Sequence, residues 1–185
     1  MTQENFDFEQ IYREYAQKVL NLCYRMVGDE QTARDLSQDI WVKVYRNLDD
    51  FRGNAAIFTW IYRIAVNHIL NYLKQQKRKR WLNLLDLNLR EALHTEETLN
   101  RLGSAAPEDN PAEQLQQKER EQIVWQQILK LPESQRAPLV LHRYEGLHYQ
   151  EIARVLGISL SAVESRLHRA KKNLQKWLEP YLGKI

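Results

Sequence analysis

The sequence predicts an all-α protein, built as two small helical domains joined by a linker. Apolar residues recur at steps of three and four over most of the chain, which is the period of an α-helix, and no segment shows the two-residue period of a strand. Only six glycines and five prolines occur in 185 residues, so turn signals are few and long helices are favoured. A hydrophobic fraction of 43% is enough for packed cores.

The first domain is predicted to span residues 1–82 and to consist of three amphipathic helices. The first helix carries one apolar stripe and ends at Gly28. The second follows directly, with Leu36 on its apolar stripe, and ends before a break at 49–54. The third carries an apolar face from about Ile57 onward and continues into a basic run. Three such helices can bury one common core.

The remainder divides into an acidic linker at 83–115 and a second domain at 116–185. Residues 84–116 hold seven acidic and two basic residues, together with Gly103, Pro107 and Pro111. In the second domain, one helix should stop at Pro132. The next should start late or bend, because Pro138 cannot donate a backbone hydrogen bond.

The end of the second domain has the layout of a helix-turn-helix. Gly157 separates two amphipathic segments, and Ser159 or Ser161 can cap the second of them. In this motif the N-terminal residues of the second helix meet base edges in a major groove. An ordinary helical hairpin with a solvated basic face is the alternative. The exposed face of the second helix is predicted to comprise Ser161, Glu164, Ser165, His168, Arg169, Lys171 and Lys172.

A second basic segment lies in the first domain. Residues 60–83 hold six basic and no acidic residues. Asparagine can pair with a base edge, while arginine and lysine neutralise phosphates. Phe51 precedes the third helix in a loop and suits a base contact, whereas Trp60 lies on the apolar stripe and is expected in the core. One polar stripe of the third helix comprises Arg63, Asn67, Asn71, Lys74 and Arg78.

Two segments resemble bacterial sigma factors of the extracytoplasmic-function group. Region two of that family is similar to ARDLSQDIWVKVYRNLDDFRGNAAIFTWIYRIAVNHILNYLKQQKR, and region four to LPESQRAPLVLHRYEGLHYQEIARVLGISLSAVESRLHRAKKNL. The matches cover about residues 8–80 and 116–178. The resemblance implies a promoter-specificity subunit that binds core RNA polymerase, has no catalytic activity of its own and needs no metal or other cofactor.

The resemblance also implies roles for residues of the first domain. The second helix would dock on polymerase, and the loop with the third helix would hold the promoter −10 element as a single strand, with one flipped base in a pocket. The polymerase-binding residues would be Asp35, Leu36, Gln38, Asp39, Trp41 and Val42. The −10 residues are Lys43, Asn47, Phe51, Arg63, Asn67, Asn71 and Lys74, of which Lys43, Asn47, Phe51 and Asn67 would form the pocket.

The recognition helix would read the −35 element as duplex DNA. Glu164 stands where some relatives have a basic residue. A carboxylate there cannot contact phosphate, but it can accept a hydrogen bond from a cytosine amino group. The −35 sequence therefore cannot be copied from those relatives. The −35 residues are Ser161, Glu164, Ser165, Arg166, His168, Arg169 and Lys172.

We expect a cytoplasmic protein without membrane insertion. The N-terminus lacks the pattern of a secretory signal, and no apolar run approaches the ~20 residues that cross a bilayer. Cys23 is the only cysteine, lies on an apolar stripe and is expected to be a packed small side chain rather than a redox sensor. The resemblance further implies an anti-sigma factor as a partner that holds the protein inactive.

Two other functions remain as alternatives. A metal-dependent nuclease could use Glu30, Asp35 and Asp39, but no histidine or further carboxylate converges on them in sequence. A stand-alone operator-binding regulator would use residues 115–185 alone and would leave the aromatic and basic residues at 51–80 unexplained.

Overall fold

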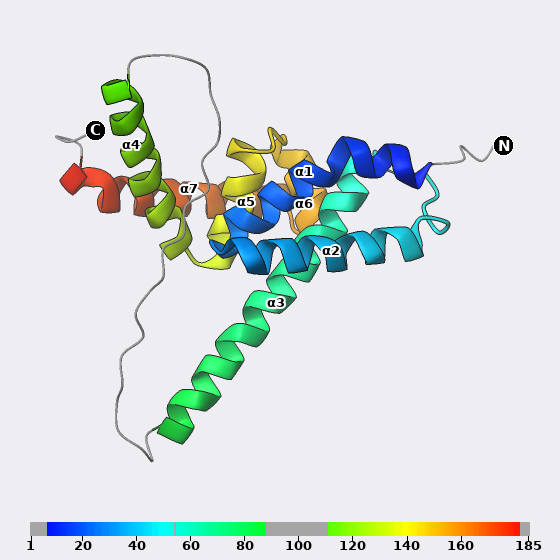
Figure 1. Cartoon of the computed structure of the whole chain (residues 1–185), viewed down its shortest axis with the longest axis horizontal. Coiled ribbons are helices and arrows are strands. Elements are labelled where there is room, and N and C mark those ends of the chain that lie inside the picture. The colour runs from blue at the N-terminus through cyan, green and yellow to red at the C-terminus, as the bar shows by residue number, and fades with distance from the viewer. Residues whose placement is uncertain (1–6, 54, 88–110, 182–185) are drawn as a thin grey trace.

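The computed structural model describes residues 7–53, 55–87 and 111–181, and this part of the chain is helical with no strand (Figure 1). The all-α prediction is therefore confirmed. The elements are α1 (Phe8–Val27), α2 (Glu30–Asn47), α3 (Ile57–Leu87), α4 (Pro111–Lys130), α5 (Glu133–Arg143), α6 (Tyr149–Leu156), α7 (Leu160–Leu178) and a short 3₁₀ helix η1 (Glu179–Tyr181).

The predicted break between α1 and α2 is confirmed in detail. Gly28 ends α1 in the left-handed conformation, with φ of 83°, and its N–H donates to the carbonyl of Tyr24. Asp29 then caps α2, because its carboxylate accepts from the N–H of Thr32 at 2.7 Å. A side chain at position 28 would be strained twice over, since a Cβ there would lie 2.6 Å from Cδ1 of Leu129.

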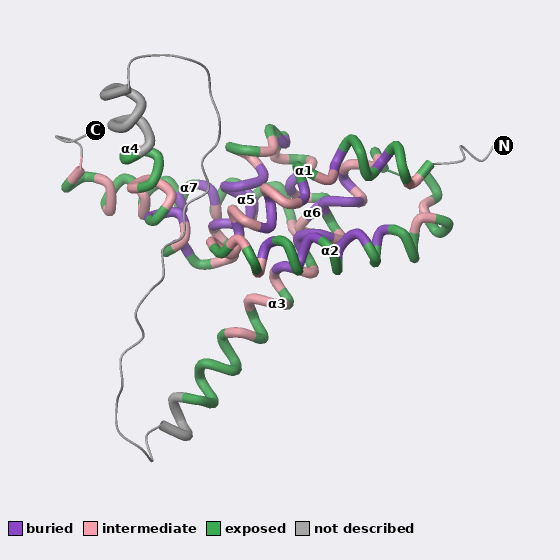
Figure 2. Tube along the Cα trace, viewed as in Figure 1, coloured by how far each residue is buried: buried purple, intermediate pink, exposed green. Residues whose placement is uncertain are grey.

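Helices α1, α2 and α3 pack around one apolar core. The apolar stripes predicted from the sequence face one another there, with Val19, Leu22, Ile40 and Val44 fully buried. Only the first part of α3 belongs to this core. The rest projects from the body of the molecule, and its residues become exposed along the projection (Figures 1 and 2).

The helices run beyond the predicted domain limits. Helix α3 continues to Leu87, past the expected boundary at 82, and α4 begins at Pro111, before the expected 116. Leu84, Leu85 and Leu87 thus belong to α3. Most of the predicted acidic linker, residues 88–110, lies outside the described residues.

Helix α5 begins earlier than the sequence predicted. It starts at Glu133, directly after Pro132, and Pro138 lies within it. The late start was therefore wrong. Pro138 lies in the middle of α5 and lacks the N–H that would bond to the carbonyl of Ser134. The burial of Leu139, Val140 and Leu141 offsets this loss.

Helices α6 and α7 form the predicted helix-turn-helix. Gly157 ends α6 with φ of 63°, in the left-handed region, and Ser159 caps α7 by accepting from the N–H of Ala162 at 3.2 Å. Of the two candidate caps, Ser159 has this role, and the hydroxyl of Ser161 lies 3.1 Å from that of Ser159. Ile152 of α6 and Val163 and Leu167 of α7 are buried between the two helices.

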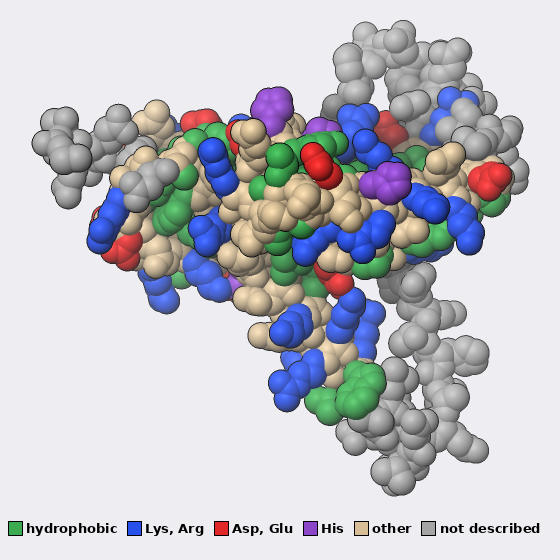
Figure 3. All heavy atoms as spheres, turned by 180° about the vertical axis from the view of Figure 1, so that it is seen from behind, with side chains coloured by type: hydrophobic (Ala, Val, Ile, Leu, Met, Phe, Trp, Pro, Cys, Tyr) green, Lys and Arg blue, Asp and Glu red, His purple; other side chains and the backbone are tan. Residues whose placement is uncertain are grey.

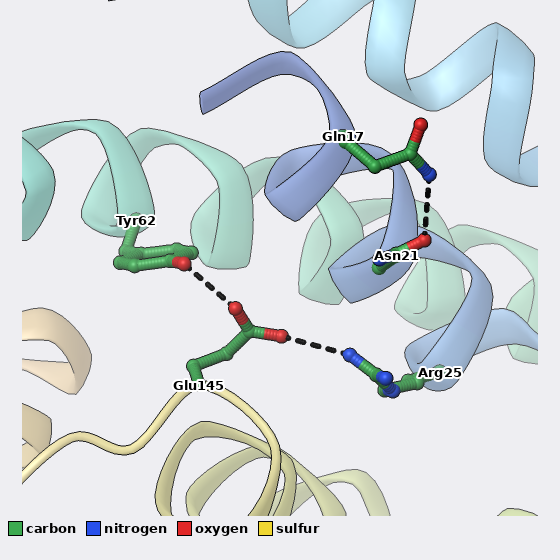
Figure 4. A network of polar contacts seen from close by, with 5 residues as sticks. All are labelled: Gln17, Asn21, Arg25, Tyr62 and Glu145. Carbon is green, nitrogen blue, oxygen red and sulfur yellow. Dashed lines mark hydrogen bonds and ion pairs between the residues drawn. The ribbon is translucent and has the colours of Figure 1, made fainter. Parts of the chain in front are cut away.

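The two halves of the chain contact each other, which the sequence analysis did not predict. Helix α1 packs on α5, and α3 packs on α6. At this joint the carboxylate of Glu145, only 4% exposed, accepts from the hydroxyl of Tyr62 at 2.7 Å and from Arg25 at 3.2 Å (Figure 4). The rings of Tyr24 and Trp125 stack nearby, with centroids 5.6 Å apart.

Candidate nucleic-acid interface

A hollow of about 370 Å³ lies between α2, the loop after it and α3. It brings together four of the seven residues predicted to hold the −10 element, namely Lys43, Asn47, Asn67 and Asn71. The full lining comprises Lys43, Asn47, Asp50, Trp60, Ile64, Asn67, His68 and Asn71. Amide and ammonium groups at one end and an indole ring at the other can together receive an unstacked base with its phosphate.

The aromatic wall of this hollow differs from the sequence-based expectation. Trp60 was expected in the core, but it is only half-buried and lines the hollow. Phe51, predicted as a base contact, packs against it with ring centroids 5.2 Å apart and planes inclined at 43°. Trp60 therefore packs against the core and also lines the hollow.

Lys43 and Asn47 are held by contacts from α2 and α3. The side-chain amide of Asn47 donates to the carbonyl of Lys43 at 2.7 Å, one turn back along α2. The ammonium of Lys43 donates to Nδ1 of His68 at 2.7 Å. His68 also approaches the predicted docking face, which consists of the residues of α2 predicted to bind polymerase, because its Nε2 lies 3.4 Å from Oδ2 of Asp39. One imidazole thus connects α3 to two successive turns of α2.

Burial and the nearby positive charge of Lys43 lower the pKa of His68 below its ordinary value, and Asp39 opposes this shift in part. The sequence placed His68 on the apolar face of α3 and gave it no role. A histidine on an apolar stripe is a common core residue, so only the fold reveals its contacts with two predicted sites.

The remaining −10 residues do not line the hollow; they are Phe51, Arg63 and Lys74. The predicted polar stripe of α3 is nevertheless exposed along its whole length, from Arg63 to Arg78. Figure 3 shows Lys and Arg side chains gathered on the projecting part of α3. This exposed positive face borders the hollow and extends away from it, as a contact with the DNA backbone would require.

The six residues predicted to bind polymerase divide into two groups. Asp35, Gln38 and Asp39 are exposed, and Val42 is 48% exposed. Leu36 and Trp41 lie in the core instead, at 4% and 6% exposed, so their side chains are not available on the surface. The apolar stripe of the second helix already contained Leu36, and its placement on a docking face came from the resemblance alone.

Trp41 is buried by aromatic residues of α1. Its ring lies 6.0 Å from that of Phe8 and 4.9 Å from that of Tyr12, both in edge-on geometry. Tyr12 and Tyr45 remain exposed beside it, at 45% and 65%. The sequence alone did not predict this exposed aromatic edge of the predicted docking face, because its residues come from two helices.

The residues predicted to read the −35 element lie along one face of α7. All are exposed except Arg166, which is half-buried. The guanidinium of Arg169 donates to the carbonyl and to Oγ of Ser165, at 3.2 and 3.1 Å. The side chain of Arg169 is therefore held against Ser165, one turn nearer the N-terminal end of α7. The residues at that end are the ones that a major groove would meet first.

The carboxylates of the nuclease alternative are engaged elsewhere. Glu30 pairs with Arg34, Asp35 accepts from Gln31 at 3.1 Å, and Asp39 approaches His68. Within residues 7–53, 55–87 and 111–181, no three histidine, cysteine or acidic side chains are grouped so that they could hold a metal ion. In the same ranges, no helix is both long and apolar enough to cross a bilayer.

Comparison with known proteins identifies the family. The family described as Sigma-70 region 2 matches residues 11–79, and Sigma-70, region 4 matches residues 121–174. The chain is 34% identical to RNA polymerase sigma-H factor of Pseudomonas aeruginosa over 95% of its length and 88% of that protein. It is 35% identical to ECF RNA polymerase sigma-E factor of Escherichia coli K12, covering 91% of this chain and 84% of that one.

Solved structures share the fold. The sigma factor RpoE of Bartonella quintana, solved in complex with the anti-sigma factor NepR, superposes with a TM-score of 0.66 and 21% identity, over 94% of this chain and 97% of that one. CnrH, solved with the cytosolic domain of CnrY, gives a TM-score of 0.61 at 23% identity, over 94% and 88%.

The sequence and its relatives place the protein in the class of non-catalytic transcription initiation factors. The chain belongs to the sigma-70 family of RNA polymerase sigma factors, in its extracytoplasmic-function group.

Proposed function

We propose that this sigma factor directs core RNA polymerase to a specific set of promoters and assists in melting them. The observation that carries the proposal is the hollow, in which Lys43, Asn47 and Asn67 converge beside the ring of Trp60. These residues would hold one unpaired base of the −10 element, while α7 binds the −35 element as duplex.

The energy for melting would come from differential binding, without covalent chemistry. Flipping a base out of a duplex costs a few kcal/mol. Stacking on an aromatic ring returns roughly 1–3 kcal/mol per base, and hydrogen bonds from Asn47 or Asn67 to the base edge add to this. Because these contacts would be made with an unpaired base, they would favour the melted promoter over the closed one.

The surfaces for polymerase and DNA would lie on adjacent faces of α2. The exposed side chains of Asp35, Gln38, Asp39 and Val42 form an acidic face with one apolar residue, suited to a basic partner surface. Lys43, next in the chain, belongs to the hollow. We further propose that the protein acts in the cytoplasm, that it has no enzymatic activity of its own, and that an anti-sigma factor restrains it by covering one of these faces.

Run-off transcription with purified core polymerase on a promoter library tests the proposal. We expect the chain to confer start-site selection on core polymerase, with selected promoters sharing two sequence elements. Sequence-specific binding by residues 111–185 alone, with no association with polymerase and no start-site selection, would instead establish the operator-binding alternative. Cleavage of DNA that depends on a divalent ion in the absence of polymerase would establish the nuclease.

A further inference from the structure

His68 touches both a predicted polymerase-binding residue and a predicted −10 residue. Its Nδ1 accepts from Lys43 at 2.7 Å, and its Nε2 lies 3.4 Å from Oδ2 of Asp39. Asp39 and Lys43 are four residues apart on α2, so they lie on the same side of that helix. The imidazole packs against both and is itself largely buried, with 17% of its side chain exposed.

The contact with Lys43 fixes the protonation state of His68. An ammonium group has no lone pair and always donates, so Nδ1 must be the acceptor, and the proton of the neutral ring must lie on Nε2, facing Asp39. An imidazolium could not accept from Lys43 and would repel it. The charged groups near this ring are Asp39 and Lys43 from α2, and Asp50 lines the same hollow.

We propose that His68 is a positioning residue, which holds Lys43 at the hollow. This inference rests on the proposed function. The ligand of Lys43 would be a phosphate or base edge of the unpaired −10 strand, both of which offer oxygen acceptors to an ammonium.

The coupling follows from the two contacts. Free Asp39 favours the protonated ring, because a carboxylate stabilises the adjacent imidazolium. When a cationic group of polymerase pairs with Asp39, that support weakens, so the ring stays neutral, and able to accept from Lys43, down to a lower pH. Docking on one turn of α2 would thereby help to keep the DNA-contacting cation on the next turn in place as the pH falls.

Fork-junction DNA with an unpaired −10 strand tests the inference in the reconstituted holoenzyme, between pH 5.5 and 8. We expect His68→Ala to weaken binding of this DNA about fivefold at pH 7.5, which corresponds to about one hydrogen bond, with core polymerase binding unchanged. His68→Asn should restore binding, because the amide oxygen can take the place of Nδ1. Since an amide does not titrate, this variant should also remove the weakening that the wild-type chain shows as the pH falls.

Two comparisons separate positioning from mere support of the fold. In a Lys43→Ala background, His68→Ala should have no further effect, since the residue it positions is gone. Lys176→Ala, which removes an exposed positive charge from the far end of α7, is the matched control for Lys43→Ala and should leave fork-junction binding unchanged. In the free chain, Asp39→Asn should lower the pKa of His68, measured from its imidazole NMR signals.

The inference would be overturned if His68→Ala bound like wild type at every pH. Equal loss in the wild-type and Lys43→Ala backgrounds, or an unchanged pKa of His68 in Asp39→Asn, would overturn it as well. Should His68→Ala fail to fold, the pH profile of His68→Asn carries the test alone. These outcomes leave the proposed function intact as long as the wild-type chain still confers start-site selection; loss of that activity would reject the proposed function itself.

Discussion

The guanidinium of Arg136 in α5 donates to the backbone carbonyl of Met26 at the end of α1, with an N···O distance of 2.5 Å. It also donates to the carbonyl of Leu131 at 3.0 Å, and the residue is buried. Arg136 thus links α5 to the end of α1 and to the residue that follows α4, because it donates to one backbone carbonyl at each place. The joint between the two halves depends on this residue and on the carboxylate of Glu145.

Replacing Arg136 should therefore weaken the joint. Arg136→Met keeps the approximate volume but leaves two buried carbonyls without these donors, which costs about 1–3 kcal/mol each. We expect a loss of about 2–5 kcal/mol in the free energy of unfolding, measured in urea. Arg143→Met, at an exposed position of the same helix, is the control and should change stability by less than about 0.5 kcal/mol. Equal stability of the two variants would show that the contact contributes nothing.

The docking face can be tested by comparing an exposed with a buried position of α2. Val42→Glu adds a charge where the side chain is 48% exposed. It should leave the fold intact and reduce affinity for core polymerase about tenfold or more, because the carboxylate must be desolvated at the interface. Co-purification and fluorescence anisotropy measure the effect. Wild-type affinity in this variant would remove Val42 from the docking face.

Leu36→Glu should behave differently, because Leu36 is 4% exposed. An unpaired charge in the core costs several kcal/mol, comparable with the whole stability of a small domain. We expect loss of the helical circular-dichroism signal of α1–α3 at 37 °C. A folded variant that merely fails to bind polymerase would show that Leu36 reaches the surface after all.

Asn67 is expected to act at melting rather than at docking. Asn67→Ala removes an amide from the hollow and should reduce open-complex formation roughly five- to 150-fold, the range of about 1–3 kcal/mol for a base-edge contact. Permanganate footprinting of unpaired thymines measures this, and polymerase affinity should not change. Unchanged affinity of the variant for a promoter that is already melted would show that Asn67 does not contact the unpaired base.

Arg169 should act on the duplex contact of α7. Arg169→Ala should weaken closed-complex binding and reduce the slope of log affinity against log salt by about one, as expected for the loss of one phosphate contact. Titrations between 50 and 300 mM salt give the slope. A changed base preference at constant slope would assign Arg169 to a base edge.

Cys23 should be inert in the folded chain. It is fully buried, and burial raises the pKa of its thiol to about 12, so almost no reactive thiolate forms at pH 8.5. Iodoacetamide should label it only at the rate of unfolding, and fully in urea. Because the folded thiol keeps its proton at pH values where the unfolded one loses it, this group should lower stability as the pH rises above about 9. Fast labelling without denaturant would indicate an open route to α1.

Much of the fold was predictable because local signals agreed with packing. Gly28 and Asp29 mark a helix end and a helix start by their own backbone and side-chain chemistry, and Ser159 does the same for α7. The stripe that contains Leu36 predicted its burial correctly. Trp41 lay off that stripe, and its burial depends on Phe8 and Tyr12 of another helix, which no local pattern contains.

The joint between the halves was beyond sequence reasoning for the same reason. From the sequence, Arg136 would be expected to be a surface cation and Glu145 to be an ordinary turn residue. Their roles arise only when α5 and the turn after it meet α1 and α3. Likewise, the contact of His68 with Lys43 joins residues 25 positions apart. The sequence therefore predicted some of the residues that line the hollow, but not His68 or the full lining.

Because Trp125 stacks on Tyr24, its fluorescence can report on the contact between the two halves of the chain. The two rings come from opposite sides of the joint and lie 13° from parallel. Indole emission responds to contact with a neighbouring ring and to water. With the other four tryptophans replaced by phenylalanine, the emission wavelength of Trp125 would report, without any added dye, whether binding of polymerase or DNA separates the two halves.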